Sequence, residues 1–149
     1  MQNTNLKNIL LVGVVIIVAV CAWVVVRNTG VDRNAEKENE VRALFDGWMK
    51  EQKTQYDYVE YKINAIEMMA AKADPNIGVE KEWFPAGASN DAYIASVDFS
   101  VRSDTPQDYW FAGNGELDEA TGWVNNKFLL VTIDKVNGSY KIINIGTGP

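Results

Sequence analysis

The sequence predicts an α+β domain in which one long amphipathic helix packs on an antiparallel sheet, behind an apolar N-terminal segment. Three observations predict this arrangement. Residues 34–52 are apolar along one helical face, the second half of the chain alternates apolar and polar residues, and Asn137-Gly138 separates the last two alternating runs. Of the 149 residues, 47% are hydrophobic, which suffices for one compact core.

The segment from Ile9 to Val26 has eighteen consecutive residues without a charge. As a helix it would be about 27 Å long, close to the hydrocarbon thickness of a bilayer. Lys7 and Arg27 flank the segment and can extend their charged ends toward the two interfaces. We therefore expect an uncleaved anchor that makes the protein a single-pass protein of the cell membrane and holds it in the lipid bilayer. The predicted parts are a tail over residues 1–8, the transmembrane anchor over 9–26, a linker over 27–33 and a soluble α+β domain over 34–149.

Two other interpretations of the apolar segment stay open. A cleaved signal peptide would need a small-x-small site followed by polar sequence, whereas AWVVV follows Cys21. A lipoprotein would be modified at Cys21 and would need a small residue before it, where the chain has Val20. The orientation is also open, because the basic residues after the segment favour a cytoplasmic domain when the positive-inside rule is applied literally.

Composition excludes several classes of function. Two of the 14 basic residues, Lys7 and Arg27, flank the apolar segment, so the 12 basic residues after Arg27 face 20 acidic ones and this part carries a net charge of −8. Nucleic-acid binding needs clustered Lys and Arg, so we expect no nucleic-acid partner. The chain has no histidine, and its single cysteine is Cys21 in the apolar segment. Histidine-based catalysis, thiol chemistry in the domain and ordinary zinc sites are therefore excluded.

Residues 34–52 have the pattern of an amphipathic helix. Five apolar residues recur at the i, i+3, i+4, i+7, i+8 spacing of one face: Val41, Leu44, Phe45, Trp48 and Met49. In a small domain such a face is more often core than a partner-binding surface, so we expect it to pack on the sheet.

Residues 58–71 fit two structures. A helix would align Val59, Ile63, Ile66 and Ala70. A strand with a one-residue shift would align Val59, Tyr61 and Ile63, and then Ile66, Met68 and Ala70. We prefer a strand over residues 61–70, followed by a turn at KADPNIG.

The later segments predict strands more clearly. One face of DAYIASVDFSVRSD is apolar, formed by Tyr93, Ala95, Val97, Phe99 and Val101. In KFLLVTIDKV the corresponding residues are Leu129, Val131 and Ile133, and SYKIINIG follows. Asn137-Gly138 between them favours a type I′ hairpin turn. We expect an antiparallel sheet of about four strands.

The segment WFAGNGELDEATGWV, from Trp110 to Val124, is rich in glycine and acids. A phosphate site would need a helix directly after the glycines, but acids and then a strand follow, so phosphate binding is excluded. A calcium site would recruit Asn114, Glu116, Asp118 and Glu119, whose spacing does not match an EF-hand. We expect a wide loop between two antiparallel strands, without a metal. Its unusual backbone dihedrals would be adopted by Gly113, Gly115 and Gly122.

Five aromatic residues are candidates for a ligand-binding set. Trp83, Trp110 and Trp123 each lie at a strand end or loop edge, and with Tyr93 and Tyr109 they could line a concave mouth of the sheet. The alternative is that they close the open end of the sheet against the helix.

The segments VRALFDGWM, YIASVDFSV, WFAGNGE, GWVNNKFLLVTIDKVNGSYKI and IGTGP carry a resemblance. Together they resemble small membrane-anchored extracytoplasmic domains of unknown function from Gram-positive bacteria, with a cystatin-like (nuclear-transport-factor-two-like) fold. The likeness covers most of the chain from Val41 to Pro149. It implies a curved, cone-like sheet and an outward-facing domain. The count of basic residues around the apolar segment favours the opposite orientation.

Three functions compete. We expect a non-enzymatic binding or assembly module with a protein partner at the cell surface, without catalytic residues or cofactors. The same superfamily includes membrane-anchored assembly factors, so the alternative is a subunit of a conjugation or type IV secretion-like complex. It also includes ketosteroid-isomerase-like enzymes, which would require a cavity carboxylate such as Asp98 or Glu67 as base and a tyrosine such as Tyr109 as donor.

Overall fold

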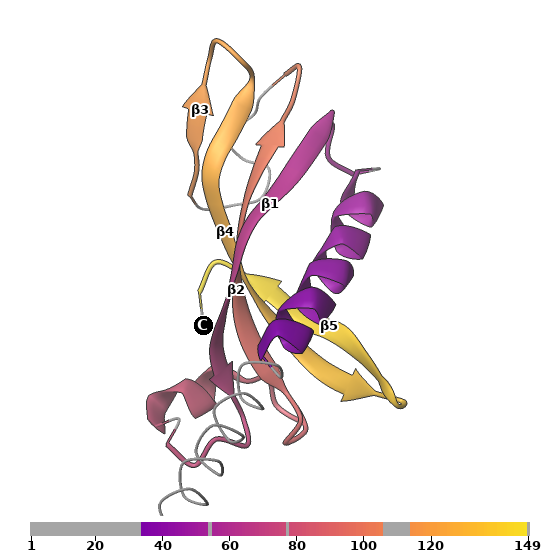
Figure 1. Cartoon of the computed structure of the whole chain (residues 1–149), viewed down its shortest axis with the longest axis vertical. Coiled ribbons are helices and arrows are strands. Elements are labelled where there is room, and N and C mark those ends of the chain that lie inside the picture. Colours follow the sequence, from indigo (N-terminus) through magenta and orange to yellow (C-terminus); the bar gives the residue numbers. More distant parts are fainter. Residues whose placement is uncertain (1–33, 54, 77, 106–113, 149) are drawn as a thin grey trace, which may run out of the picture. The chain divides into compact units, whose positions relative to one another are not determined.

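The structure, a computed structural model, describes residues 34–53, 55–76, 78–105 and 114–148. Within these residues the fold is α+β, with one long helix packed on a five-stranded antiparallel sheet (Figure 1). No helix among the described residues is long and apolar enough to cross a membrane. The predicted anchor, its tail and the linker lie outside the described residues. The helix from Glu38 onward and the whole sheet belong to one compact unit, Glu38–Pro149.

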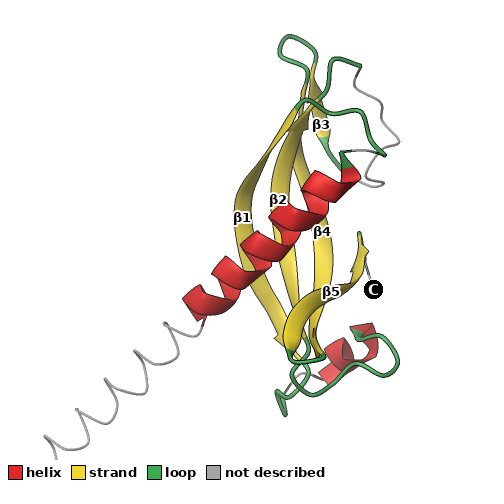
Figure 2. Cartoon of the chain, turned by 90° about the vertical axis from the view of Figure 1, so that its right-hand side faces the viewer, coloured by secondary structure: helices red, strands yellow, loops and turns green. Residues whose placement is uncertain are grey.

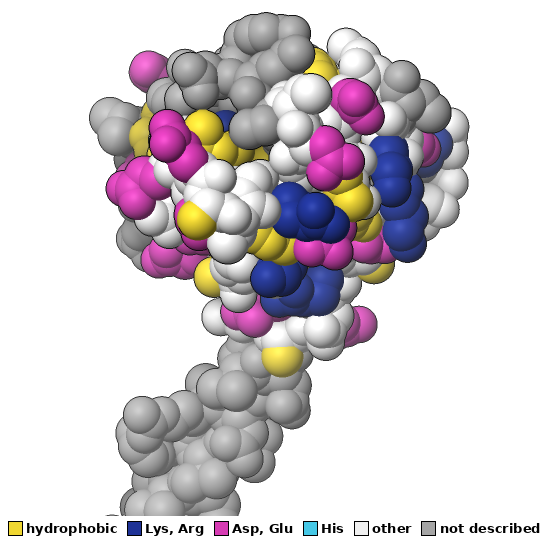
Figure 3. All heavy atoms as spheres, turned by 90° about the horizontal axis from the view of Figure 1, so that it is seen from above, with side chains coloured by type: hydrophobic (Ala, Val, Ile, Leu, Met, Phe, Trp, Pro, Cys, Tyr) yellow, Lys and Arg dark blue, Asp and Glu magenta, His cyan; other side chains and the backbone are white. Residues whose placement is uncertain are grey.

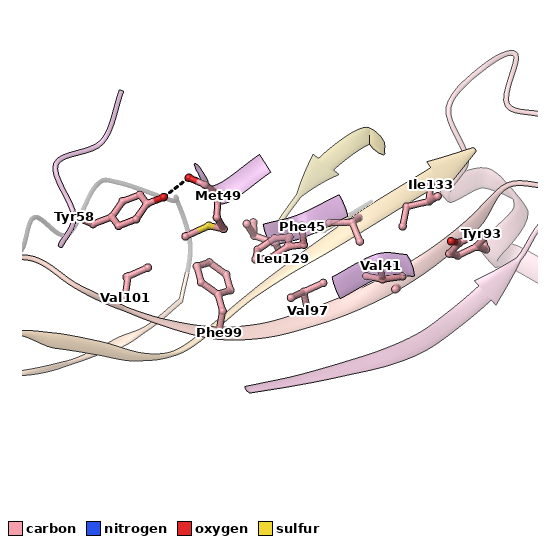
Figure 4. Packing of buried hydrophobic residues seen from close by; sticks show 12 residues of the cluster. Val41, Phe45, Met49, Tyr58, Tyr93, Val97, Phe99, Val101, Leu129 and Ile133 are labelled. Carbon is pink, nitrogen blue, oxygen red and sulfur yellow. Dashed lines mark hydrogen bonds between the residues drawn. The ribbon is translucent and has the colours of Figure 1, made fainter. Parts of the chain in front are cut away.

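The helix covers residues 34–52, as the apolar spacing predicted. It lies across one face of the sheet (Figure 2). Val41, Phe45 and Met49 are fully buried, and the Phe45 and Phe99 ring centroids are 5.3 Å apart. These side chains point from the helix toward those of the sheet (Figure 4). The predicted face is therefore the core face of the helix.

The sheet is built from five strands. They are β1 (Glu60–Ala71), β2 (Tyr93–Arg102), β3 (Glu116–Asp118), β4 (Trp123–Val136) and β5 (Ser139–Gly146). β2 lies between β1 and β4, and the other edge of β4 pairs with β3 near its start and with β5 near its end. Asn137 and Gly138 have φ values of 54° and 84°, both positive as a type I′ turn requires, so the predicted hairpin is confirmed.

β1 settles the ambiguity of residues 58–71 in favour of the strand. Its register with β2 shifts between Ile63 and Ala65 and again between Met68 and Ala70, so the expected one-residue shift is confirmed. The shift keeps four side chains packed against the core cluster: Tyr61, Ile63, Ile66 and Met68. The backbone of this segment pairs with β2, which a helix would not do.

The expectation of about four strands and of a plain wide loop after Trp110 was wrong in one respect. Residues Glu116–Asp118 form β3, an edge strand that pairs with the start of β4. The chain reverses through residues 119–122, where Gly122 has a φ of 72° and its N–H donates to the Asp118 carbonyl at 2.8 Å. Gly115, with a φ of 138°, also confirms the predicted dihedrals, and Gly113 lies outside the described residues. A three-residue strand is too short for alternation to reveal it.

A smaller apolar cluster covers part of the opposite face of the sheet. It contains Phe84, Ala92 and Ile94, with Trp83 packed against them. Trp83 ends η1 (Gly78–Trp83), a short 3-10 helix in the connection between β1 and β2. The first half of β2 is therefore buried on both faces, by the helix on one side and by this connection on the other.

Asp134 fastens this connection to the sheet. Its carboxylate is almost fully buried and accepts hydrogen bonds from the N–H and the hydroxyl of Ser89 and from the N–H of Lys135. The Ser89 hydroxyl, with the backbone donors, holds the pKa of Asp134 below its ordinary value, although burial acts in the opposite direction.

This arrangement predicts a stability difference that depends on pH. Since the pKa of Asp134 is lowered by folding, its contribution is present above the unfolded pKa of about 3.9 and is lost as pH falls through the folded value. Asp134→Asn is therefore expected to cost about 1–3 kcal/mol at neutral pH and less below about pH 4. Urea unfolding at several pH values measures this, with the exposed Asp91→Asn as control. An undiminished difference in acid would contradict the prediction.

Candidate functional site: the Trp123 face

The structure separates the three described members of the aromatic set. Tyr93 and Trp83 lie near the start of β2, on opposite faces of the sheet, whereas Trp123 pairs with Arg102 at the far end of β2. Tyr109 and Trp110 lie outside the described residues. Trp83, Tyr93 and Trp123 therefore do not line one common mouth.

Tyr93 is a structural anchor between the helix and the sheet. It is fully buried, and its hydroxyl donates to the Glu40 carboxylate at 2.8 Å. Burial, followed by the neighbouring Glu40, raises the pKa of Tyr93 far above its ordinary value, so the hydroxyl stays protonated. Its ring also packs edge-on against Tyr140, with centroids 5.9 Å apart. Tyr93 therefore closes the sheet against the helix, as the alternative interpretation of the five aromatic residues stated.

Trp123 lies on the sheet face that is turned away from the helix. The next residue, Val124, packs into the main core, so Trp123 points to the opposite side. The Lys62 ammonium from β1 lies 4.0 Å from the centroid of the Trp123 ring, which is the geometry of a cation–π contact. Phe128 shares this face and is 39% exposed.

We call this surface the Trp123 face and define it by Glu60, Lys62, Asp98, Arg102, Trp123 and Phe128. The Arg102 guanidinium joins β2 to β1 through Glu60, with Nε 3.1 Å from Oε1. Acidic and basic side chains lie side by side at this end of the domain, with apolar side chains between them (Figure 3). Such half-exposed ion pairs contribute roughly 0–1 kcal/mol each, so they order the surface more than they stabilise the fold.

Asp98 lies on this open face and not in an apolar cavity. Its Oδ1 accepts a hydrogen bond from Asn64 Nδ2 at 2.9 Å, and the same amide group donates to Ser100 Oγ at 3.0 Å. Glu67, the other carboxylate considered as a base, is exposed on β1. Neither residue has the buried environment with a neighbouring tyrosine that the isomerase-like hypothesis requires, so that hypothesis gains no geometric support.

The acids of the glycine-rich segment act within their own turn. Asp118 accepts from Thr121 Oγ1 at 2.7 Å and from the Ala120 N–H at 3.0 Å, and the Thr121 hydroxyl holds its pKa below the ordinary value. Glu116 accepts from Asn126 Nδ2 at 3.1 Å. In the described part of the chain, no three Asp, Glu, Cys or His residues gather in a group that could hold a metal ion.

A concave region lies between the helix and β1. It is an open groove of about 620 Å³ lined by Asn39, Arg42, Ala43, Asp46, Tyr61 and Ile63. Arg42 donates to the Ile63 carbonyl at 3.3 Å, and Asp46 accepts from Lys50 at 2.6 Å and from the Tyr61 hydroxyl. Lys50 and Tyr61 lower the pKa of Asp46, while burial and Asp46 raise that of Tyr61. The contacts from Arg42 and from Tyr61 fasten the helix to β1.

Sequence reasoning missed most of these contacts. Asp46 and Lys50 have the i,i+4 spacing that a helix brings together, so this ion pair could have been predicted from the sequence. The Lys62–Trp123 contact joins residues that are 61 positions apart in the chain, so no local sequence pattern predicts it. No protein-family model matches the chain, and no curated protein or solved structure matches it either.

Proposed function

We propose that this chain is a membrane-tethered, extracytoplasmic binding or assembly module without enzymatic activity, and that it engages a protein partner through the Trp123 face. The observation that carries the binding role is the Lys62–Trp123 contact, in which Lys62 is exposed and Trp123 half-buried. Arg102 pairs with Trp123 across the strands, and the exposed Phe128 lies further along β4 on the same face. Trp and Arg dominate the energetics of protein interfaces because they combine large apolar area with a few directed donors. The tether rests on the uncharged run from Ile9 to Val26.

The described polar groups support a binding role more than a reactive one. Tyr93 and Glu40 bind each other, Asp134 binds Ser89, and Asp118 binds Thr121. The first two pairs hold one element to another, and the third holds its own turn. The side chains with exposed apolar surface, by contrast, include Phe128 on the Trp123 face.

The finer features of the fold belong to the same proposal. The register shifts in β1 and between Phe99 and Val101 of β2 increase local twist and bend strands, which supports a curved sheet of the cystatin-like kind. A concave sheet with a helix against one face leaves the opposite face for partners, and the Trp123 face lies there.

The binding role predicts a matched pair of variants. Trp123→Ala and Phe128→Ala are each expected to weaken partner binding, Trp123→Ala by about 2 kcal/mol or roughly thirty-fold, since both rings would be buried in the complex. Ile143 on β5 is 37% exposed, close to the 39% of Phe128, and Ile143→Ala is expected to leave binding unchanged. The measurement is recovery of a membrane partner from detergent extract with each variant as bait.

A stoichiometric partner that is lost with Trp123→Ala and kept with Ile143→Ala supports the proposal. If that partner belongs to a large membrane assembly, the chain is a subunit of a conjugation or type IV secretion-like machine. Recovery of the chain alone, or equal recovery with all variants, contradicts binding through this face.

The tether and its orientation predict a protease pattern. In intact cells stripped of their wall, added protease is expected to degrade the domain of the full chain, while a chain lacking residues 9–26 stays in the soluble cytoplasmic fraction and is protected until lysis. The reason is that the apolar run directs the domain across the membrane and holds it there. Cleavage of the full chain only after lysis would overturn the outward orientation, and its recovery in the soluble fraction would overturn the tether.

A further inference from the structure

The chain contains two Asn-Gly pairs, Asn114-Gly115 and Asn137-Gly138. In such a pair the backbone nitrogen of glycine can attack the side-chain carbonyl carbon of asparagine, because glycine has no Cβ to hinder the approach. Two properties of the site favour attack. A polarised asparagine carbonyl is more electrophilic, and a more acidic glycine N–H gives up its proton more readily.

At Asn114 the side-chain carbonyl is polarised by the protein. Its Oδ1 accepts a hydrogen bond from the Phe128 N–H at 3.0 Å. Phe128 lies in the stretch of β4 between the part that pairs with β3 and the part that pairs with β5. A backbone donor placed at a carbonyl oxygen stabilises the negative charge that develops there during attack, as in an oxyanion hole.

The peptide between Asn114 and Gly115 is activated at the same time. Its carbonyl oxygen accepts a hydrogen bond from Lys127 Nζ at 2.6 Å. Because the carbonyl and the Gly115 N–H share one conjugated peptide unit, a cation on the oxygen draws electron density from the nitrogen and makes its N–H more acidic. Within the described residues the Gly115 N–H donates to no acceptor.

The Lys127 ammonium has no counter-charge among the described residues. The side chain is only 4% exposed, and among the described residues no carboxylate forms an ion pair with it. Burial lowers its pKa. An uncompensated buried charge is costly, so a carboxylate formed at position 114 would supply the missing partner and stabilise the product.

We infer that Asn114-Gly115 is a self-modification site at which the chain converts an asparagine into an acidic residue. The Gly115 nitrogen bonds to Cγ of Asn114, the Cγ–Nδ2 bond breaks, and ammonia leaves with the proton from Gly115. Water then adds to either carbonyl of the resulting succinimide, which gives aspartate or isoaspartate. The net change replaces one carboxamide by one carboxylate next to Lys127.

Asn137-Gly138 provides an internal control in the same molecule. It forms the exposed tip of the β4–β5 hairpin, and a Cβ on Gly138 would meet nothing within 4 Å. In the described structure its asparagine side chain accepts no hydrogen bond and has no cation on its carbonyl oxygen. It shares the dipeptide chemistry and lacks both activating contacts.

The first test is peptide mapping by mass spectrometry, with enzymatic detection of isoaspartate, after incubation of the full chain in mild detergent. In the folded chain, conversion at Asn114 is expected to be about tenfold faster than at Asn137, which corresponds to about 1.4 kcal/mol of barrier. In urea the two rates are expected to converge, since the contacts are lost. Faster or equal conversion at Asn137 in the folded chain would overturn the inference.

Two variants separate activation from product stabilisation. Lys127→Met keeps an unbranched apolar stem and removes the cation, so it is expected to slow conversion at Asn114 about tenfold and leave Asn137 unchanged. Asn114→Asp copies one product and is expected to raise the melting temperature of the chain, whereas Asn137→Asp is not. An unchanged rate at Asn114 in folded Lys127→Met, or a lower melting temperature for Asn114→Asp, would contradict the assigned role of Lys127. If Lys127→Met does not fold, the comparison of Asn114 with Asn137 in the unmodified chain decides alone.

Discussion

Phe45→Ala is expected to lower the free energy of unfolding by about 3–5 kcal/mol, which is a large part of the stability of a small domain. Phe45 is fully buried at the centre of the helix face, with ring centroids 5.4 Å from Trp48 and 5.3 Å from Phe99. Its removal leaves a cavity that the close-packed core can fill only in part. Urea unfolding of the full chain in mild detergent, followed by tryptophan fluorescence, measures the loss.

Gly47→Ala is the matched control on the same helix. Gly47 is exposed, and a Cβ built there would meet nothing within 4 Å. Alanine is favoured over glycine in a helix interior by about 1 kcal/mol, so this variant is expected to be more stable than the parent. A loss below about 1 kcal/mol for Phe45→Ala would mean that the helix does not pack on the sheet as described.

Gly122→Ala is expected to produce the second large loss, because two costs add at this position. Gly122 has a φ of 72°, where an alanine costs about 1–2 kcal/mol. A Cβ would also lie 2.9 Å from the carbonyl oxygen of Ser103, a backbone atom that cannot rotate away. The Ser103 N–H donates to the Gly122 carbonyl at 3.2 Å. The clash therefore falls where the end of β2 is hydrogen-bonded to the turn before β4.

Gly138→Ala separates the two costs. Gly138 has a φ of 84°, but a Cβ there would enter open space. Both variants therefore carry the cost of a positive φ, and only Gly122→Ala carries the clash. The loss for Gly122→Ala is expected to exceed that for Gly138→Ala by at least about 1 kcal/mol in urea unfolding. Equal losses would show that the turn relaxes around the new methyl group.

Local pattern was sufficient for the helix and for most of the sheet. The helix at residues 34–52 and the hairpin at Asn137-Gly138 each depend on residues within a few positions of one another. β1 was harder, because a bulged strand breaks strict alternation and its apolar residues then also fit a helix. β3 was missed because three residues carry no usable period.

The candidate site was predictable in part only. Trp123 was expected at a strand end and lies at the start of β4, but its neighbour Lys62 comes from β1. Tyr93 was expected beside it, yet the alternation of β2 that the sequence itself shows places Tyr93 on the core face. Residue type indicated which side chains were suited to binding, while pairing and register determined which of them became exposed.

The amino-acid sequence by itself determined the class of the domain, the apolar faces of its helix and strands, and the uncharged run at residues 9–26, because each depends on residues close together in the chain. Only the tertiary structure decided that Lys62 meets Trp123, that Lys127 is buried against Asn114, and that Glu40 holds Tyr93. These contacts depend on strand order, on bulges and on which edge of β4 each neighbour occupies. Such long-range choices are set by the free energy of the whole packed core and leave no local period in the sequence.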